Sequence, residues 1–276
     1  MKTTRLRLAL LLGACLSSAA AAAHANDTEE TGARSMQTTA TCCAVLELRQ
    51  YTLKPGQREV LIGLFDEKFV AGQEDAGMTI VGQFRDLDAP DRFVWLRGFA
   101  GMPQRKRALE TFYGGPVWQG NRITANGTMI DSDNVLLLRP ATVTSGFALQ
   151  GLARDRRPAG LVVAYLHYLQ RPASASMVGD MEWRLRSALQ SSGAQLQAVL
   201  VSEHSENTFL ALPVRLGEEV LVWVAGFADQ AAYDAQRVAL EEIASVLQPL
   251  QSVPAERLHL SPTAGSLLRG MQETQP

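Results

Sequence analysis

Apolar and polar residues alternate along several short stretches of the chain, the pattern of strands that bury at least one face. The first stretch, VLELRQY, lies in a predicted strand at about 44–52 and puts Leu46 and Leu48 on one face. Its other face carries three polar side chains, Glu47, Arg49 and Tyr51. The same pattern predicts seven further strands, at 78–86, 92–100, 134–139, 161–169, 195–202, 219–228 and 257–260.

Between these strands, apolar residues recur at three- and four-residue intervals, as on the buried face of a helix. Several boundaries carry the residues that start or stop helices, such as Pro103 in a first turn and Asp229 at a cap. The predicted helices lie between Gly56 and Gly77, at 103–112, at 117–125, from Ser174 to Gly193, and from Asp229 to about Leu247.

The order of these elements is β-α-β-β-α-β, and it occurs twice. The first set spans residues 44–140 and the second spans 161–262, with a linker at 141–160 and a tail at 263–276. Each set would form a four-stranded sheet that has helices on one side and a bare second face. The sequence therefore predicts an α+β protein of two tandem ferredoxin-like units whose sheets pack bare face to bare face.

Residues repeat as well as elements. WLRGFA at 95–100 matches WVAGFA at 223–228, and Tyr51 matches Tyr168, each tyrosine being followed by a basic residue and a proline. The two offsets, 128 (223 minus 95) and 117 (168 minus 51), differ by 11 residues. A longer loop in the second half, at about 206–218, explains this difference.

Four stretches of the first half resemble the NIPSNAP family. They are ELRQYTLKPG at 47–56, WLRGF at 95–99, FYGGPVW at 112–118 and MIDSDNVLLLRP at 129–140. The resemblance covers about 44–140 and is much weaker from 160 to 260. It implies the dimeric α/β-barrel fold, in which two ferredoxin-like units pair their sheets into a barrel, and here the two halves would supply that barrel themselves.

The resemblance implies less about function. Eukaryotic NIPSNAP proteins are linked to mitochondria, which cannot apply directly to an exported protein. The wider superfamily includes quinol monooxygenases, muconolactone isomerases, aldoxime dehydratases and haem-handling enzymes. Their catalytic residues differ, so the resemblance transfers no catalytic residue to this sequence.

Five side chains from the first and third strands are the predicted ligand-pocket residues. They are Glu47, Arg49, Tyr51, Trp95 and Arg97. Because the apolar Leu46 and Leu48 are assigned to the helix-covered face, we expect these five to point into the barrel. An aromatic wall with two guanidiniums, a carboxylate and a phenol suits a small anionic or carbonyl-containing ligand.

Three functions fit these residues. The first is ligand binding without chemistry. The second is a cofactor-free enzyme of monooxygenase or isomerase type, in which Glu47 acts as a general base if burial raises its pKa. The third is a non-catalytic interaction or scaffold protein with a filled barrel, in which Glu47 bridges Arg49 or Arg97 and fixes the register of the sheet.

No cofactor and no metal are predicted. The histidines that follow the leader, His167, His204 and His259, show no recognisable ligand spacing, and His167 should face the helices. Nucleotide-binding, zinc-protease and nucleophile-elbow signatures are absent from the sequence. The adjacent Cys42 and Cys43 could bridge only through a strained ring, so we interpret them as a poorly ordered pair.

The formal net charge of −2 argues against a nucleic-acid partner, and the run Arg105-Lys106-Arg107 is interpreted as a solvated helix face. Residues 1–25 have the basic start, apolar stretch and A-x-A end of a signal peptide, followed by a flexible leader at 26–43. The sequence thus predicts a periplasmic or secreted protein without a membrane span. A lipoprotein anchored at Cys15 is the alternative, and a homodimer is left open.

Overall fold

The structure is a computed structural model, and it describes residues 41–154, 159–190 and 192–270. These residues all belong to one unit, Thr38–Pro276. The predicted signal peptide, Cys15 and the leader up to residue 40 lie outside the described residues. Within the described part, no helix has both the length and the apolar character needed to cross a bilayer.

The strands and helices of the first half follow the predicted order. They are β1 (Val45–Leu53), α1 (Arg58–Leu64), the π-helical segment η1 (Phe65–Phe69), α2 (Val70–Asp75), β2 (Thr79–Asp86), β3 (Arg92–Phe99), α3 (Met102–Gly114), α4 (Pro116–Thr128) and β4 (Met129–Pro140). The start of β4 lies earlier than the predicted residue 134. Exposed polar residues such as Asp131 and Asp133 hide this part of the strand from a hydrophobicity pattern.

The second half has the same order of elements. They are β5 (Leu161–Leu169), α5 (Ala175–Gln190), β6 (Gln195–Ser202), β7 (Glu219–Phe227), α6 (Gln230–Ser245), the 3₁₀ turn η2 (Gln248–Leu250) and β8 (Glu256–Pro262). Asp229 caps α6 as expected, because its carboxylate accepts a hydrogen bond from the Ala232 backbone N–H.

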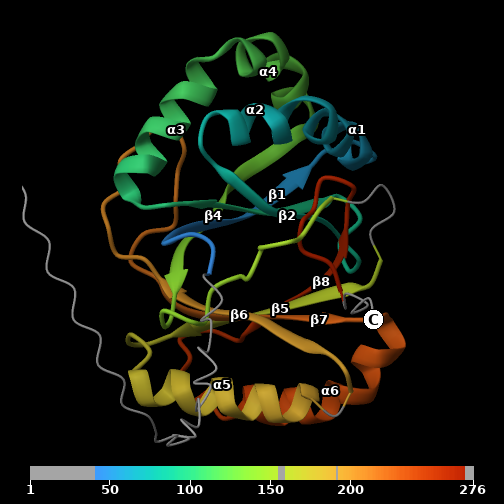
Figure 1. The fold of residues 1–276 in the computed structure, drawn as a ribbon, viewed down its shortest axis with the longest axis vertical. Coiled ribbons are helices and arrows are strands. Elements are labelled where there is room, and N and C mark those ends of the chain that lie inside the picture. The colour runs from blue at the N-terminus through green and yellow to red at the C-terminus, as the bar shows by residue number, and fades with distance from the viewer. Residues whose placement is uncertain (1–40, 155–158, 191, 271–276) are drawn as a thin grey trace, which may run out of the picture. The chain divides into compact units, whose positions relative to one another are not determined.

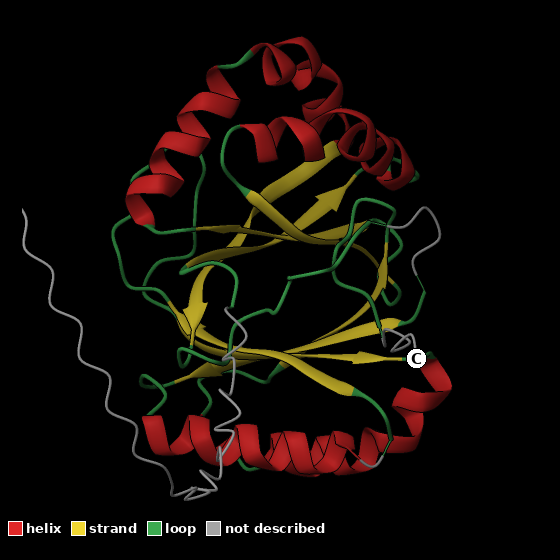
Figure 2. Ribbon diagram, viewed as in Figure 1, coloured by secondary structure: helices red, strands yellow, loops and turns green. Residues whose placement is uncertain are grey.

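All eight strands join in a closed antiparallel barrel, in the order β1-β3-β2-β8-β5-β7-β6-β4. The two halves meet along two seams, where β2 pairs with β8 and β4 pairs with β6. Helices α1–α4 cover the outside of one sheet, and α5 and α6 cover the outside of the other (Figures 1 and 2). The prediction of an α+β barrel protein is confirmed.

The inside of the barrel is filled by apolar side chains from every strand. Leu46 and Leu48 of β1 pack there against Val94 and Leu96 of β3, and none of the four is more than 3% exposed. This apolar filling leaves no place among these side chains for the charged residues of β1.

The five predicted pocket residues lie on the outer face of the sheet, beneath the helices, and the prediction that they point into the barrel is wrong. They are Glu47, Arg49, Tyr51, Trp95 and Arg97. Alternation correctly showed which residues share a face. It could not show which face is inward, because the barrel and the helices together bury both faces of β1.

On β5, His167 lies towards the helices as predicted, and Leu166 and Tyr168 lie inside the barrel. The strand register corrects one detail of the repeat. Arg49 lies opposite Trp95, whereas Tyr165 lies opposite Trp223, so the strand position of Tyr51 corresponds to His167 and not to Tyr168. The two tyrosines match in sequence but lie on opposite faces of their strands.

Segments outside the strands also pack against the barrel. Cys42 and Cys43 form a disulfide that packs against the interior cluster, so their interpretation as a poorly ordered pair is wrong. Gly98 leaves the space that the Cys43 sulfur occupies. Beyond β8, Ser266 is buried and the backbone of Leu268 bonds to β2, which extends the ordered chain past residue 262.

Candidate functional site

A cavity of about 320 Å³ lies over the outer face of the first-half sheet, beneath its helices. Two of the predicted pocket residues, Tyr51 and Trp95, line it. The remaining lining is mostly aromatic and aliphatic, and comes from the helices, β4 and the loop at 203–218: Leu61, Phe65, Phe69, Gln73, Phe112, Tyr113, Trp118, Ala125, Asn126, Met129, Ser132, Phe209, Ala211 and Leu212. The exposed Asn126 and Ala211 and the half-exposed Ser132 place its opening between α4, β4 and the loop at 203–218.

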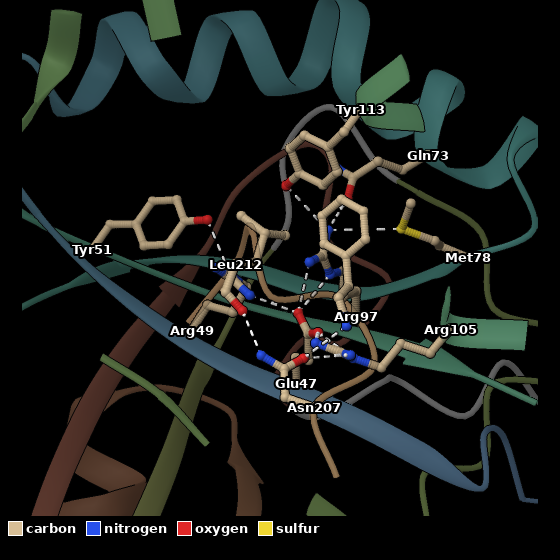
Figure 3. A network of polar contacts seen from close by, with 11 residues as sticks. Glu47, Arg49, Tyr51, Gln73, Met78, Arg97, Arg105, Tyr113, Asn207 and Leu212 are labelled. Carbon is tan, nitrogen blue, oxygen red and sulfur yellow. Dashed lines mark hydrogen bonds and ion pairs between the residues drawn. The ribbon is translucent and has the colours of Figure 1, made fainter. Parts of the chain in front are cut away.

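Next to this cavity, one carboxylate is surrounded by three arginines (Figure 3). Glu47 accepts hydrogen bonds from Arg49 Nη1 at 2.7 Å, Arg97 Nε at 2.8 Å and Arg105 Nε at 2.7 Å. All four side chains are fully buried. The cluster therefore holds one negative charge and three positive charges away from bulk water.

The arginines reach the cavity wall through the side chains that line it. Arg49 Nε donates to the Tyr51 hydroxyl at 3.0 Å, and Arg97 Nη1 donates to Gln73 Oε1 at 3.0 Å and to the Tyr113 hydroxyl at 3.4 Å. The Arg97 guanidinium also lies 5.0 Å from the Trp95 ring centre. These contacts join the charged cluster to the aromatic pocket.

Two buried donors of this region have no hydrogen-bond partner among the described residues. They are the indole Nε1 of Trp95, which lines the cavity, and Nη2 of Arg49. Nη2 of Arg97 and Nη2 of Arg105 also lack a well-oriented bond, although each lies 2.7 Å from a Glu47 oxygen. These two nitrogens are ion-paired with Glu47. Of these four nitrogens, those of Trp95 and Arg49 are the ones left without a partner among the described residues.

The charges around Glu47 determine its protonation. Burial alone would raise the pKa of this carboxyl, but Arg97, Arg49 and Arg105 outweigh it and hold the pKa well below its usual range. Glu47 is thus a carboxylate saturated with donors. A general base needs a pKa near the working pH, so the expectation that Glu47 acts as a base is not met by its surroundings.

Arg105 and its partner Asn207 were not predicted from the sequence as site residues. Arg105 was interpreted as part of a solvated run, yet it is fully buried while its neighbour Lys106 is 53% exposed. Its Nη1 donates at 3.0 Å to Oδ1 of Asn207, which belongs to the loop of the second half. The position of Arg105 three residues before Ala108 and four before Leu109, on the buried face of α3, is the signal that could have identified it.

The loop at 203–218 closes the cavity from the second half. Its backbone bonds to β4 at both ends, through Glu203 to Leu137 and through Arg215 to Val135. Between these anchors, Phe209 stacks on Tyr113 with ring centres 5.8 Å apart. The extra loop length inferred from the repeat offsets is therefore the segment that covers this cavity.

Among the described residues, the corresponding face of the second half holds no such charged cluster. Val163 and Ala225 occupy the strand positions of Glu47 and Arg97. Tyr165 stacks on Trp223 with ring centres 4.2 Å apart. The charged cluster thus belongs to the first half alone.

No group of three metal-ligating side chains that could hold a metal ion occurs within residues 41–154, 159–190 and 192–270. The three histidines each contact protein groups instead. His167 accepts from Trp223 at 3.2 Å, His259 lies 2.8 Å from Asp88, and His204 lies 3.5 Å from Glu219.

Comparison with known proteins finds a family match in the first half. Residues 46–144 match the family model described as NIPSNAP. A NIPSNAP domain protein from Burkholderia xenovorans is 14% identical, with 36% of this chain and 95% of that chain covered at a TM-score of 0.33. A NIPSNAP family protein from Agrobacterium tumefaciens is 19% identical, with coverage of 36% and 95% and a TM-score of 0.34.

A solved structure described as an anthrone oxidase-like protein spans more of the chain. It is 11% identical, with 85% of this chain and 99% of that chain covered at a TM-score of 0.49. No curated protein matches the chain.

Proposed function

We propose that residues 46–144, which match the NIPSNAP family model, bind a small anionic or carbonyl-containing ligand in the cavity beneath α1–α4. The observation that carries this proposal is the position of the cavity. It is lined by Tyr51 and Trp95 and lies beside a buried cluster with two more positive than negative charges (three minus one). Excess buried charge is costly, and an anion or a carbonyl dipole would offset that cost.

An enzymatic role is the second candidate. The saturated Glu47 leaves this site without an evident base, so a cofactor-free oxygenation or isomerisation would rely on a substrate that ionises readily. Tyr51 and the arginines would then stabilise negative charge on the substrate.

A scaffold protein with a filled barrel is the third candidate, and the apolar packing inside the barrel favours it. The ligand proposal does not depend on the barrel interior, because the cavity lies outside it. The two candidates therefore differ in one respect only, which is whether the cavity beneath the helices is used.

We also propose that the two halves are tandem ferredoxin-like units. The two sheets have equivalent strand orders, β4-β1-β3-β2 in the first half and β8-β5-β7-β6 in the second. Each sheet also carries a tryptophan on its helix-covered face. Export through a signal peptide at residues 1–25 and assembly as a homodimer remain proposals that rest on the sequence.

The test of ligand binding is a thermal-shift screen of small aromatic and aliphatic acids, ketones and their neutral analogues. We expect a subset of the acids or carbonyl compounds to raise the melting temperature of the wild-type protein. Ala211→Trp should abolish these shifts, because Ala211 lines the cavity mouth and an indole there would fill it.

The matched control is Leu210→Trp. Leu210 is the preceding residue of the same loop, but its side chain is 84% exposed and does not line the cavity. Ligand shifts that survive Ala211→Trp, or that both variants abolish equally, would contradict binding in this cavity.

A further inference from the structure

The polar groups deep in the cavity wall are donors. The Tyr51 and Tyr113 oxygens already accept hydrogen bonds from Arg49 and Arg97, so each hydroxyl is left with its proton to donate. The Trp95 indole can only donate, and it has no partner among the residues described. Gln73 Oε1 accepts from Arg97, which leaves the NH₂ group as its free end.

The charges near these donors also favour a negatively charged ligand. β1 contributes Glu47 and Arg49, β3 contributes Arg97, and α3 contributes Arg105, which together carry a charge of +2 (three minus one). The other lining residues of the helices and of the loop at 203–218 are neutral. The carboxylates that flank Ser132 at the opening, Asp131 and Asp133, are exposed to solvent.

Burial also keeps the phenol of Tyr51 protonated, because desolvation raises its pKa. A tyrosine that does not ionise can donate to a ligand oxygen but cannot take a proton from the ligand. With Glu47 saturated as well, the lower cavity wall has no group suited to hold a ligand proton. A ligand O–H would therefore find there only oxygens already engaged by arginines, whereas an unprotonated oxygen would find several donors.

From this arrangement we infer that the cavity binds its ligand as an oxyanion, a phenolate, enolate or carboxylate on an aromatic or apolar body, held by donors from Tyr51, Tyr113 and Trp95. The inference rests on the proposed function, and it selects the anion over the neutral carbonyl compound. It also explains why charge is concentrated below an otherwise aromatic pocket. The aromatic walls bind the body of the ligand, and the arginines stabilise its charge through the tyrosines.

The test uses 4-nitrophenol, whose ionisation near neutral pH is visible because only the phenolate is yellow. With the full chain in excess, we expect the bound probe to ionise at lower pH than the free probe. An apparent shift of about one pH unit means that phenolate binds about tenfold more tightly than phenol, or about 1.4 kcal/mol. Benzoate should compete with the probe if carboxylates bind too.

Three variants locate the effect. Tyr51→Phe and Trp95→Phe each remove one donor and keep the ring, so each should reduce the preference for phenolate several-fold. Tyr113→Phe is the alternative if a buried variant does not fold, since Tyr113 is only half-buried. The matched control is Tyr165→Phe, a buried phenol of the second half that lies outside the cavity, and it should leave the preference unchanged.

Neutral 4-nitrotoluene separates failure of the inference from failure of the proposed function. If both probes quench tryptophan fluorescence but bound 4-nitrophenol ionises at the same or higher pH than free, the cavity binds ligands and the oxyanion inference is overturned. If 4-nitrophenol, benzoate and 4-nitrotoluene all fail to bind, both proposals are overturned. A lowered ionisation pH that all three cavity variants retain would also overturn the assignment to these donors.

Discussion

At the scale of single residues, the buried carboxylate of Glu47 holds the charged cluster together. It is the shared partner of three buried guanidiniums, and it joins β1, β3 and α3. Replacing both partners of a buried ion pair can be nearly neutral, but removing one partner leaves an uncompensated buried charge. In this cluster, substitution of Glu47 alone would leave three buried positive charges uncompensated.

We therefore expect Glu47→Gln to lower the free energy of unfolding by about 3–5 kcal/mol or more, measured by urea denaturation. Glu59→Gln provides the control, because Glu59 pairs with Arg85 but is 60% exposed. That change should cost no more than about 1 kcal/mol. A Glu47→Gln protein as stable as the control would mean that the arginines are compensated by bound anions or water.

The sequence predicts which side chains belong to this site better than it predicts the face of the sheet on which they lie. The alternation along β1 grouped Glu47 with Arg49 and Tyr51, and the family resemblance drew attention to the same strand. Their direction depends on which side of a doubly buried strand supplies polar partners. Those partners, Arg105 and Asn207, are 58 and 160 residues away from Glu47 in sequence (105 minus 47, 207 minus 47), and no local pattern contains them.

At the scale of elements, the loop at 203–218 decides whether the cavity is closed. Its middle is held to the first half by the Arg105–Asn207 hydrogen bond and by the stacking of Phe209 on Tyr113. Asn207 Nδ2 in turn donates to the Leu212 carbonyl at 2.9 Å, which folds the loop back over the pocket.

Phe209→Ala should open this loop without unfolding the sheet beneath it. Loss of the stacked ring is expected to cost about 1 kcal/mol in stability and to raise amide exchange at residues 207–212, with β1 still protected. Hydrogen exchange followed by mass spectrometry measures both segments in one experiment. Leu210→Ala, at the exposed neighbour, should change neither, and equal exchange in the two variants would argue against a closing role for Phe209.

Most strand boundaries were predictable because the strands are short apolar runs between turn residues, and the polar start of β4 is the exception. The π-helical turn η1 was not predictable in this way. It lies within a continuous helical pattern, yet its two ends place Phe65 and Phe69 side by side on the cavity wall, with ring centres 5.3 Å apart. Helical periodicity alone does not distinguish such a local widening from a regular helix.

At the scale of the whole molecule, barrel closure makes each half a support for the other. Strand pairing crosses between the halves at both seams, and the interior cluster contains residues of all eight strands. A change that destabilises the second half should therefore also destabilise the cavity of the first half. Acid titration of a buried histidine provides a way to test this coupling.

His167 lies in the second half, and burial lowers its pKa to about 4. In the unfolded chain histidine titrates near 6.5, so between these values only the unfolded state binds the proton. The free energy of unfolding should thus fall by about 3 kcal/mol as the pH is lowered from about 6.5 to about 4. Above pH 6.5 this contribution is fully present.

Urea denaturation at several pH values measures the effect in both halves. It is followed by tryptophan fluorescence and by the release of a bound cavity ligand. His167→Gln should flatten the pH dependence in this window, whereas His204→Gln, at a histidine 55% exposed, should leave it intact. Two separate transitions, with only the second half sensitive to pH, would contradict the coupling across the seams.

The enclosure of both sheets by one polypeptide has a further consequence for stoichiometry. A barrel built from two identical chains must present every side chain twice, related by its symmetry axis. Here one half carries the Glu47 cluster while the other has Val163 and Ala225 at the same strand positions and contributes the Phe209 loop instead. Each barrel should therefore bind a single equivalent of cavity ligand at saturation. A mutation in either half that alters binding should then act on this one site.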